Sequence, residues 1–429
     1  MFQESFLDFI DRGVASGQRT LADSVRSLLC ACAPELFEAL DLQDDALFLE
    51  PLLFAWLSAP APAVPLEQLL FGYLADDAKP SSVEVRCDRA GVAFLPRLGE
   101  VATGLPGAAL RLDWDAARRE FVFSSHGTAV RAAPERLHTV AGGRVEVFRR
   151  ENPLLGRLFV DEQGDAGEVE VDGIARAQLA NLAAGFGLLA RCHPRYSRNV
   201  LDVTRRVMIF SSPGLNSFAA MSAHGVAFLN TAPEASPVFF LEDLAHQCGH
   251  LVFGAMTLET GEYLKVPAET PLQHFTGVPG ERRTVYETFH GVFTEAVMFQ
   301  CLDACWEGGC QTGAGAHELR GRMAAVLRRF GGDLRSLARP GVFTEAGEWV
   351  FQNLVEAFND AGEKRWEMLR GLDLSNQPYN FSYACFAELN PLSDDADEPG
   401  VEELSAILAE PCEHAEGTEE ERAATSQPA

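Results

Sequence analysis

The sequence predicts an α+β protein with a mainly helical metal-binding core domain, a small β-rich subdomain and an N-terminal helical segment. Apolar residues recur at helical spacing over most of the second half of the chain, whereas short runs separated by turn residues occupy part of the first half. The chain has 429 residues of which 47% are hydrophobic, enough for a sizeable core. The expected divisions are 1–80 (N-terminal helices), 81–174 (β-rich subdomain), 175–390 (metal-binding core) and 391–429 (acidic tail).

The N-terminal segment is expected to form short amphipathic helices up to about residue 57. Phe6 and Ile10 begin a series of apolar residues at helical spacing. The Pro- and Ala-rich stretch 58–65 follows as a connector, because proline restricts the backbone to extended conformations. A further helix is expected around Leu66–Leu74.

Five short apolar runs then predict the strands of the β-rich subdomain. Turn residues such as Gly142 and Gly143 separate them, which is typical of short β-strands. This part of the sequence carries no visible chemistry. The expected strands are Val83–Arg86, Val92–Leu95, Leu110–Trp114, Glu120–Ser124 and Gly143–Phe148.

The core domain is expected to combine two buried strands with long helices. The runs Val203–Phe210 and Val226–Leu229 are almost continuously apolar, as strands inside a domain are. Helical periodicity and the absence of interrupting prolines indicate the helices. They are Ile174–Ala190, Val238–Met256, about Glu281–Ala304, about Ala316–Phe330 and Thr344–Leu369.

The formal charge of −27, from 62 acidic and 35 basic residues, argues against nucleic acid or an anionic membrane as a partner. Residues 391–429 contain twelve acidic residues and one arginine, hence −11, and are expected to be disordered with a short helix near Val401–Leu408. The start of the chain lacks the basic region of a signal peptide, and no apolar run is long enough to span a membrane. A cytoplasmic location is therefore expected.

The ten cysteines are expected to be mostly buried thiols. Cys301, Cys305 and Cys310 do not have the paired C-x-x-C spacing of a zinc ribbon. Cys248 is expected to pack in the core, because it lies on a different helical face from its histidine neighbours.

His246-Gln247-Cys248-Gly249-His250 is the most informative stretch of the chain. Imidazoles at positions i and i+4 lie on one face of a helix and can bind one divalent metal ion. Zinc peptidases carry Glu directly after the first His as a general base, whereas this chain has Gln247, whose amide takes up no proton at neutral pH. The alternative is a pair of core histidines with hydrogen-bond partners and no metal.

A third ligand is expected on the helix that follows, where His290, Glu287 and Glu295 are the candidates. At about 100° per residue, Arg283 lies about 20° and Glu287 about 60° from His290, so these three share one helical face. Glu295 lies about 140° from His290, too far to share one metal with it, and is otherwise expected to be solvated or ion-paired. Zinc peptidases prefer a carboxylate here, which keeps Glu287 and Glu295 open as alternative ligands.

Three blocks of this region resemble the HExxH-motif proteins of peptide natural-product clusters, a family of α-ketoglutarate-dependent peptide β-hydroxylases. The resemblance covers roughly residues 175–370. The chain departs from the family at the catalytic position Gln247, where an oxygenase needs no protein base, and in lacking the prolines that flank the family's arginine. The blocks are Asn216-Ser217-Phe218 with His224–Asn230, Ala245–His250, and Arg283 through His290-Gly291-Val292-Phe293.

The resemblance implies that His246, His250 and His290 bind Fe(II). It further implies that Arg283 pairs with a carboxylate of α-ketoglutarate, a role that suits the planar fork of a guanidinium, and that Ser217 contacts the same cofactor. The implied substrate is a ribosomally synthesised precursor peptide, hydroxylated at a side-chain β-carbon.

Two other functions stay open. A zinc metallopeptidase would need a base from elsewhere, such as Glu242 or Glu287. A non-catalytic peptide-binding protein would keep the fold without the metal. Bound metal separates this last function from the two enzymes, and dependence on α-ketoglutarate separates the enzymes from each other.

Overall fold

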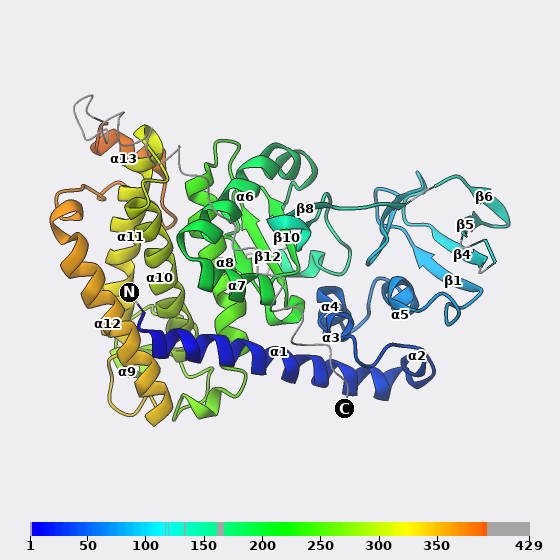
Figure 1. Cartoon of the computed structure of the whole chain (residues 1–429), viewed down its shortest axis with the longest axis horizontal. Helices are drawn as coiled ribbons and strands as arrows, with labels where there is room; N and C mark the ends of the chain where they lie inside the picture. Colours follow the sequence, from blue (N-terminus) through cyan, green and yellow to red (C-terminus); the bar gives the residue numbers. More distant parts are fainter. Residues whose placement is uncertain (1, 116, 119, 133, 161–166, 393–429) are drawn as a thin grey trace, which may run out of the picture.

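The computed structural model describes residues 2–115, 117–118, 120–132, 134–160 and 167–392, and these residues form a mixed α+β molecule. The molecule is elongated: long helices form one end, a sheet contacted by helices lies in the middle, and antiparallel strands form the other end (Figure 1). The mixed class expected from the sequence is confirmed. The acidic tail from residue 393 onward and the expected helix near Val401–Leu408 lie outside the described residues.

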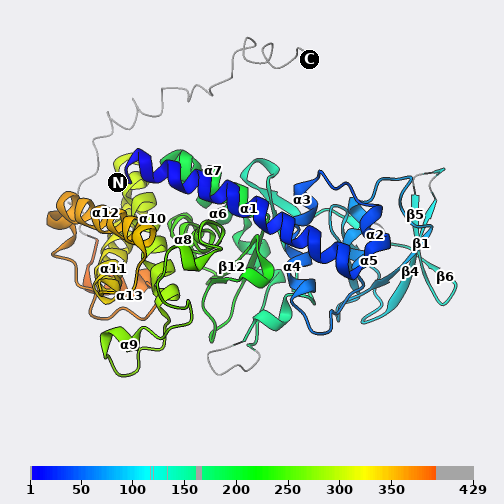
Figure 2. The ribbon, with the colours of Figure 1, turned by 90° about the horizontal axis from the view of Figure 1, so that it is seen from below.

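One long helix, α1 (Glu4–Cys32), takes the place of the first short helices expected near the N-terminus and runs along one side of the molecule (Figures 1 and 2). It packs against α7 (Pro194–Val203) and α8 (Pro237–Met256). A Cβ atom at Gly17 would lie 1.9 Å from the carbonyl oxygen of Ala255, so only glycine permits this close crossing. The short elements that follow are α2 (Pro34–Glu38), α3 (Asp45–Phe48), α4 (Pro51–Leu57), α5 (Leu66–Leu70) and η1 (Phe71–Tyr73).

Antiparallel strands form the β-rich end of the molecule, opposite the end where the last long helices of the described chain lie (Figure 1). One sheet has the order β1-β4-β5-β6 and the other the order β2-β3-β7, and a separate hydrophobic core lies beneath them. Four of the five expected strands are found here. The strands are β1 (Ser82–Arg86), β2 (Val92–Leu95), β3 (Gly99–Ala102), β4 (Ala109–Asp115), β5 (Glu120–Ser125), β6 (Thr128–Val130) and β7 (Pro134–Glu135).

The central sheet has the order β11-β12-β10-β9-β8, with β10 parallel to both β9 and β12. The fifth expected strand, Gly143–Phe148, is β9 and belongs to this sheet, because its buried Val145 and Val147 pack in the main core. Helix α6 (Asp172–Cys192) and α8 contact the sheet. The strands are β8 (His138–Val140), β9 (Val145–Val147), β10 (Arg206–Phe210), β11 (Phe218–Ala219) and β12 (Val226–Asn230).

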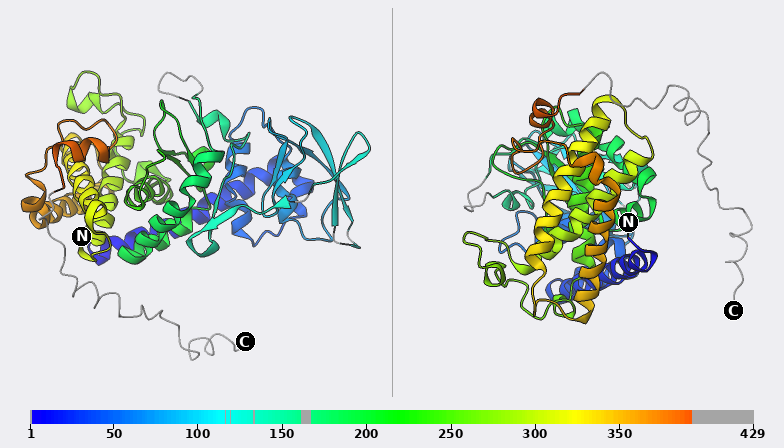
Figure 3. Two further views of the ribbon diagram at one scale, coloured as in Figure 1. Left: turned by 90° about the horizontal axis from the view of Figure 1, so that it is seen from above. Right: turned by 90° about the vertical axis from the view of Figure 1, so that its left-hand side faces the viewer.

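Helix α8 is buried over most of its length. Of the long helices that follow it, the first two contact it and the last packs against those two (Figure 3). Within the described residues, no helix is both long and apolar enough to cross a membrane. The long helices are α10 (Val285–Glu307), α11 (Gly313–Leu337) and α12 (Glu345–Leu369). The short ones are η2 (Ala141–Gly143), η3 (Gly156–Leu158), η4 (Met221–Ala223), η5 (Thr260–Glu262), α9 (Gln273–Thr276) and α13 (Tyr383–Leu389).

Candidate metal centre

The two motif histidines lie one turn apart on α8. The helix begins after Ser236, whose hydroxyl accepts a hydrogen bond from the backbone N–H of Phe239 at 3.0 Å, and Pro237 occupies its first turn. Apolar side chains surround the helix, so it is held in the core and its few polar residues are fixed there. The ring centroids of His246 and His250 are 4.8 Å apart.

Helix α10 brings His290 to the same place. A Cβ atom at Gly249 would lie 3.1 Å from the side-chain methyl of Thr294, so the motif glycine permits the close approach of α8 and α10. The ring centroids of His290 and His250 are 4.3 Å apart. The Nε2 atom of His290 donates to the backbone carbonyl of His250 at 2.8 Å, which leaves the Nδ1 lone pair of His290 free.

The surroundings keep all three imidazoles neutral at neutral pH. Burial, with smaller effects of Arg329 and His290, lowers the pKa of His246 to about 3. Burial also lowers the pKa of His290 to about 4 and that of His250 well below its ordinary value. A neutral imidazole is the form that binds a metal ion.

The three histidines fit a divalent transition metal by their chemistry, but their rings are not yet arranged around one point. As a set, their nitrogens do not all lie within 4.8 Å of one another. Within the described residues, the His250 ring makes no hydrogen bond, so nothing of that kind holds it in its present orientation. Binding of one metal ion by all three histidines therefore requires rotation of their side chains. Within the described residues, no hydrogen bond opposes rotation of the His250 ring.

Gln247 connects His246 to a chain of polar groups. Its Nε2 atom lies 3.1 Å from Nδ1 of His246 and donates to Oδ1 of Asp243 at 3.2 Å. The hydroxyl of Ser217 donates to the other oxygen of Asp243 at 2.7 Å. Ser217, expected at the cofactor, thus reaches the histidines through Asp243 and Gln247. Asp243 was not predicted from the sequence, although it precedes Gln247 by one helical turn.

Asp243 has the titration behaviour of a group that exchanges protons near neutral pH. Burial raises the pKa of its carboxyl to about 7, against the lowering effect of the hydrogen bonds from Ser217 and Gln247. The Oε1 atom of Gln247 is buried without a hydrogen-bond partner. The amide oxygen of Gln247, an acceptor, and the carboxyl group of Asp243, a potential donor, therefore lie next to each other near His246.

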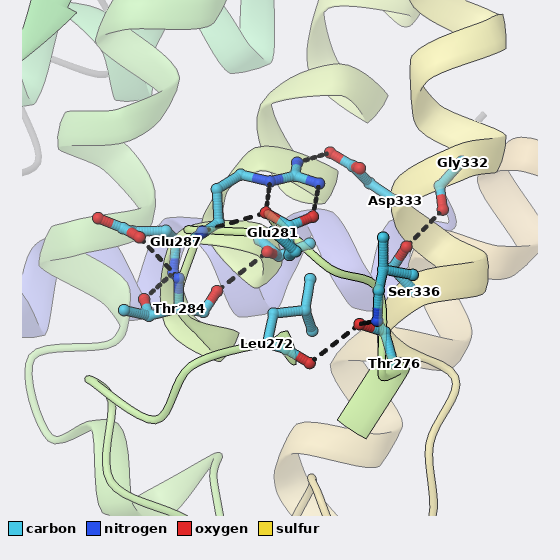
Figure 4. Close-up of polar contacts among 11 residues, drawn as sticks. Leu272, Thr276, Glu281, Thr284, Glu287, Gly332, Asp333 and Ser336 are labelled. Carbon is cyan, nitrogen blue, oxygen red and sulfur yellow. Dashed lines mark hydrogen bonds and ion pairs between the residues drawn. The ribbon is translucent and has the colours of Figure 1, made fainter. Parts of the chain in front are cut away.

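Arg283 does not lie on the helix that carries His290, which corrects the expected helical placement. Helix α10 begins at Val285 and not near Glu281, because the side chain of Thr284 caps it. The guanidinium of Arg283 donates to Glu281 at 2.8 Å and to Asp333 at 2.7 Å; both carboxylates are labelled in Figure 4. Arg283 is therefore ion-paired with two carboxylates of the protein itself.

The acidic residues considered from the sequence have three different surroundings. Glu287 is exposed, and its carboxylate accepts the backbone N–H of Thr284 at 2.7 Å as part of a capping box (Figure 4). Glu242 is buried and paired with Arg322 at 2.7 Å. Glu295, expected to be solvated or ion-paired, is instead buried with Oε2 unpartnered, and burial raises its pKa well above the ordinary value.

Two further features lie near the histidines, and of their residues Arg329 and Tyr286 were not predicted from the sequence. Arg329 of α11 lies close enough to lower the pKa of His246, and its Nε atom is buried without a partner. Phe253 and Tyr286 flank His290, with ring centroids 5.2 and 5.5 Å from the imidazole. A cation and an aromatic wall thus border the site.

The chain matches no protein-family model, and no curated protein matches it significantly. The residues that bear on function are the neutral histidines, a glutamine in place of the peptidase base, and an arginine that is partly unpartnered among the described residues.

Proposed function

We propose that this protein is a cytoplasmic Fe(II)- and α-ketoglutarate-dependent oxygenase that hydroxylates a side-chain β-carbon of a ribosomally synthesised precursor peptide. The observation that carries the proposal is the gathering of three neutral imidazoles, from α8 and α10, beside a glutamine where a peptidase has its base. His246, His250 and His290 would hold the metal. When bound, iron and the ketoacid supply the activation of O2 for insertion into a C–H bond.

In this proposal Gln247 orients a ligand and does not act as a base. Rotation of the Gln247 amide by 180° exchanges the positions of its nitrogen and its oxygen. The amide oxygen then accepts a hydrogen bond from Nδ1–H of His246, and the lone pair on Nε2 of His246 becomes free. Asp243, whose pKa is about 7, can then donate its proton to the same amide oxygen. Hydrogen bonds of this kind fix the tautomer of a metal-binding histidine.

Arg329 takes the role first expected of Arg283, the binding of a ketoacid carboxylate. The guanidinium of Arg283 is held by Glu281 and Asp333. Among the described residues, Arg329 has an unpartnered Nε and only a 3.6 Å ion pair, with Glu242. A guanidinium with free donors near the histidines suits a bidentate carboxylate.

The aromatic residues keep water from the reacting centre. Phe253 packs on His290 and on Phe293, with centroid distances of 5.2 and 4.9 Å, and both phenylalanines are fully buried. Exclusion of water limits wasteful oxidation when the peptide is absent.

The zinc peptidase is the weaker function, because both bases considered for it have other roles. Glu242 is ion-paired with Arg322, and Glu287 closes the capping box of α10. A base must be free to accept the proton of the attacking water.

The test of the proposal uses the full chain purified without oxygen and reconstituted with Fe(II). About one metal ion per chain is expected, with loss of binding in His246→Ala and His250→Ala. With α-ketoglutarate, O2 and the cognate peptide, the protein should form succinate and add one oxygen atom to the peptide. Cleavage of peptides with zinc and without ketoacid would identify a peptidase instead, and absence of any metal binding would leave the non-catalytic function.

A further inference from the structure

Three cysteines distant in sequence meet where α6 and α10 end. Cys192 is the last residue of α6, Cys305 lies in the last turn of α10, and Cys310 follows α10 in a turn. Their sulfur atoms all lie within 4.8 Å of one another, and those of Cys192 and Cys310 are 3.6 Å apart. In the described part of the chain, no other set of three histidine, cysteine or acidic residues brings its ligand atoms this close.

Two glycines turn the chain so that Cys310 returns to Cys305. Gly309 has a φ of 57°, in the left-handed region that favours glycine, and the backbone N–H of Cys310 donates to the carbonyl of Cys305 at 3.1 Å. A Cβ atom at Gly308 would lie 3.1 Å from the sulfur of Cys310. The local sequence therefore makes room for this sulfur.

The sulfur separations suit ligands of one metal ion. The 3.6 Å between Cys192 and Cys310 is far longer than the roughly 2.05 Å of a disulfide bond. Two thiolates on one tetrahedral zinc ion, each about 2.3 Å from the metal, are about 3.8 Å apart. We propose that Cys192, Cys305 and Cys310 bind one thiophilic d10 ion, Zn(II) or Cu(I), through three thiolates, which are the soft ligands that both ions favour.

The three cysteines of the cluster differ in their exposure to solvent. Cys192 and Cys310 are half-buried and Cys305 is buried, so the ion has a route in and a protected position once bound. Its coordination would join the end of α6 to the end of α10.

This site is separate from the histidines and does not depend on the proposed oxygenase. His290 and Cys305 stand fifteen residues apart on α10, hence about 22 Å along the helix axis. The two sites can therefore be emptied independently by substitution.

Cobalt(II) titration of the full chain tests the thiolate site. The chain carries His246→Ala, so that the histidine site does not contribute, and is reduced and freed of metal beforehand. One equivalent of Co(II) should give a near-ultraviolet sulfur-to-cobalt charge-transfer band, which excess Zn(II) or Cu(I) removes. The thermal midpoint should rise by several degrees with the tighter of these two ions, as mass action requires.

Substitution decides whether the three named sulfurs are the ligands. Cys310→Ser, in the half-buried turn, and Cys192→Ser should each weaken binding at least tenfold, and Cys32→Ser, an exposed cysteine of α1, should change nothing. Circular dichroism checks that each variant is folded. The proposal is overturned if the charge-transfer band is absent, if it survives in Cys310→Ser and Cys192→Ser, or if thiol titration finds a Cys192–Cys310 disulfide in metal-free protein under reducing conditions.

Discussion

At the scale of single residues, Gln247 changes the meaning of the histidine motif. The glutamate of a zinc peptidase accepts a proton, whereas the amide of Gln247 lies between His246 and Asp243 and makes contacts with both. In the proposed function, the role of Gln247 is to orient the imidazole of His246. Partners of this kind behind a metal ligand affect metal affinity about 10- to 100-fold.

Replacement of Gln247 by leucine should therefore weaken metal binding about 10- to 100-fold without abolishing it, because His246 stays but loses its orienting partner. Competition with a chelator measures this affinity. The matched control is Gln178→Leu, which removes a buried glutamine that donates to the carbonyls of Ala232 and Pro233, far along the chain from the motif. Equal metal affinity in wild type and Gln247→Leu would remove Gln247 from the site.

Glu295 gives a pH-dependent prediction in the metal-free protein. Burial raises its folded pKa well above the ordinary 4.5, so this carboxyl stays protonated in the folded chain and ionises in the unfolded chain. Its contribution to stability is complete below pH 4.5 and is lost as the pH rises toward the folded pKa. Glu295→Gln should thus be more stable than wild type at pH 7.5, on the order of 1–2 kcal/mol.

Denaturant unfolding at pH 5 and pH 7.5 checks this difference for Glu295→Gln. The control on the same helix is Glu287→Gln, which should be nearly neutral at both pH values because glutamine also serves at this position of a capping box. A stability difference between wild type and Glu295→Gln that does not grow with pH would contradict the buried, protonated state of Glu295.

At the scale of elements, local periodicity predicted most helices and strands; one error arose where a distant residue decides, and the other where a local capping box sets the start of a helix. Helix α1 continues through Gly17, because that glycine meets Ala255 of α8 and does not end the helix. Helix α10 begins at Val285 because of the Thr284 cap, and this shift takes Arg283 off the helix. The sequence alone identified neither contact partner.

A buried ion pair joins α4 to the central sheet and predicts acid sensitivity. Glu50, which caps α4, is paired with Arg206 of β10 and accepts the hydroxyl of Tyr73 at 2.6 Å. Burial raises the pKa of Glu50, but Arg206 outweighs it and the net pKa is lowered, so this stabilisation is present above pH 4.5 and is lost as the pH falls through the folded pKa.

Glu50→Gln should therefore destabilise the chain by about 3 kcal/mol at pH 7, since it removes the buried charge partner of Arg206 and leaves the pair with Glu146, which is partly exposed. It should also flatten the fall of stability below pH 4.5. Glu84→Gln, in the exposed pair with Arg86, is the control and should change stability by less than about 1 kcal/mol. If the stability of Glu50→Gln fell below pH 4.5 as steeply as that of wild type, another group would be responsible for the loss of stability in acid.

At the scale of the whole molecule, the sequence predicted the mixed class and the three histidines that gather between α8 and α10. It did not predict Arg329, Asp243 or the sulfur cluster. Cys192 and Cys310 are 118 positions apart, and no periodicity reports a contact over such a separation. The β-rich end was also predicted, although β9 joined the central sheet instead.

The separate core of the β-rich end predicts local unfolding. Leu112 is fully buried in that core, so Leu112→Ala should cost about 3 kcal/mol and loosen the β-rich end without affecting the histidines. Hydrogen exchange should rise in β1, β4 and β5 and stay unchanged in α8 and α10. Leu302→Ala, in the main core, should instead raise hydrogen exchange in α8 and α10 and leave it unchanged in β1, β4 and β5. A uniform rise of exchange in Leu112→Ala would mean that the two cores unfold together.

The central claim is that the histidines hold iron to which a ketoacid binds, and an anaerobic titration tests it most directly. Fe(II) and then α-ketoglutarate are added to the full chain while visible absorption is recorded. We predict that the wild-type protein shows the charge-transfer band of a ketoacid bound to iron and that His246→Ala does not. Arg329→Ala should need at least tenfold more ketoacid to give the band. Arg157→Ala, which changes an arginine outside the site, should leave the band unaltered. No band in the wild-type protein at saturating Fe(II) and ketoacid would contradict the account.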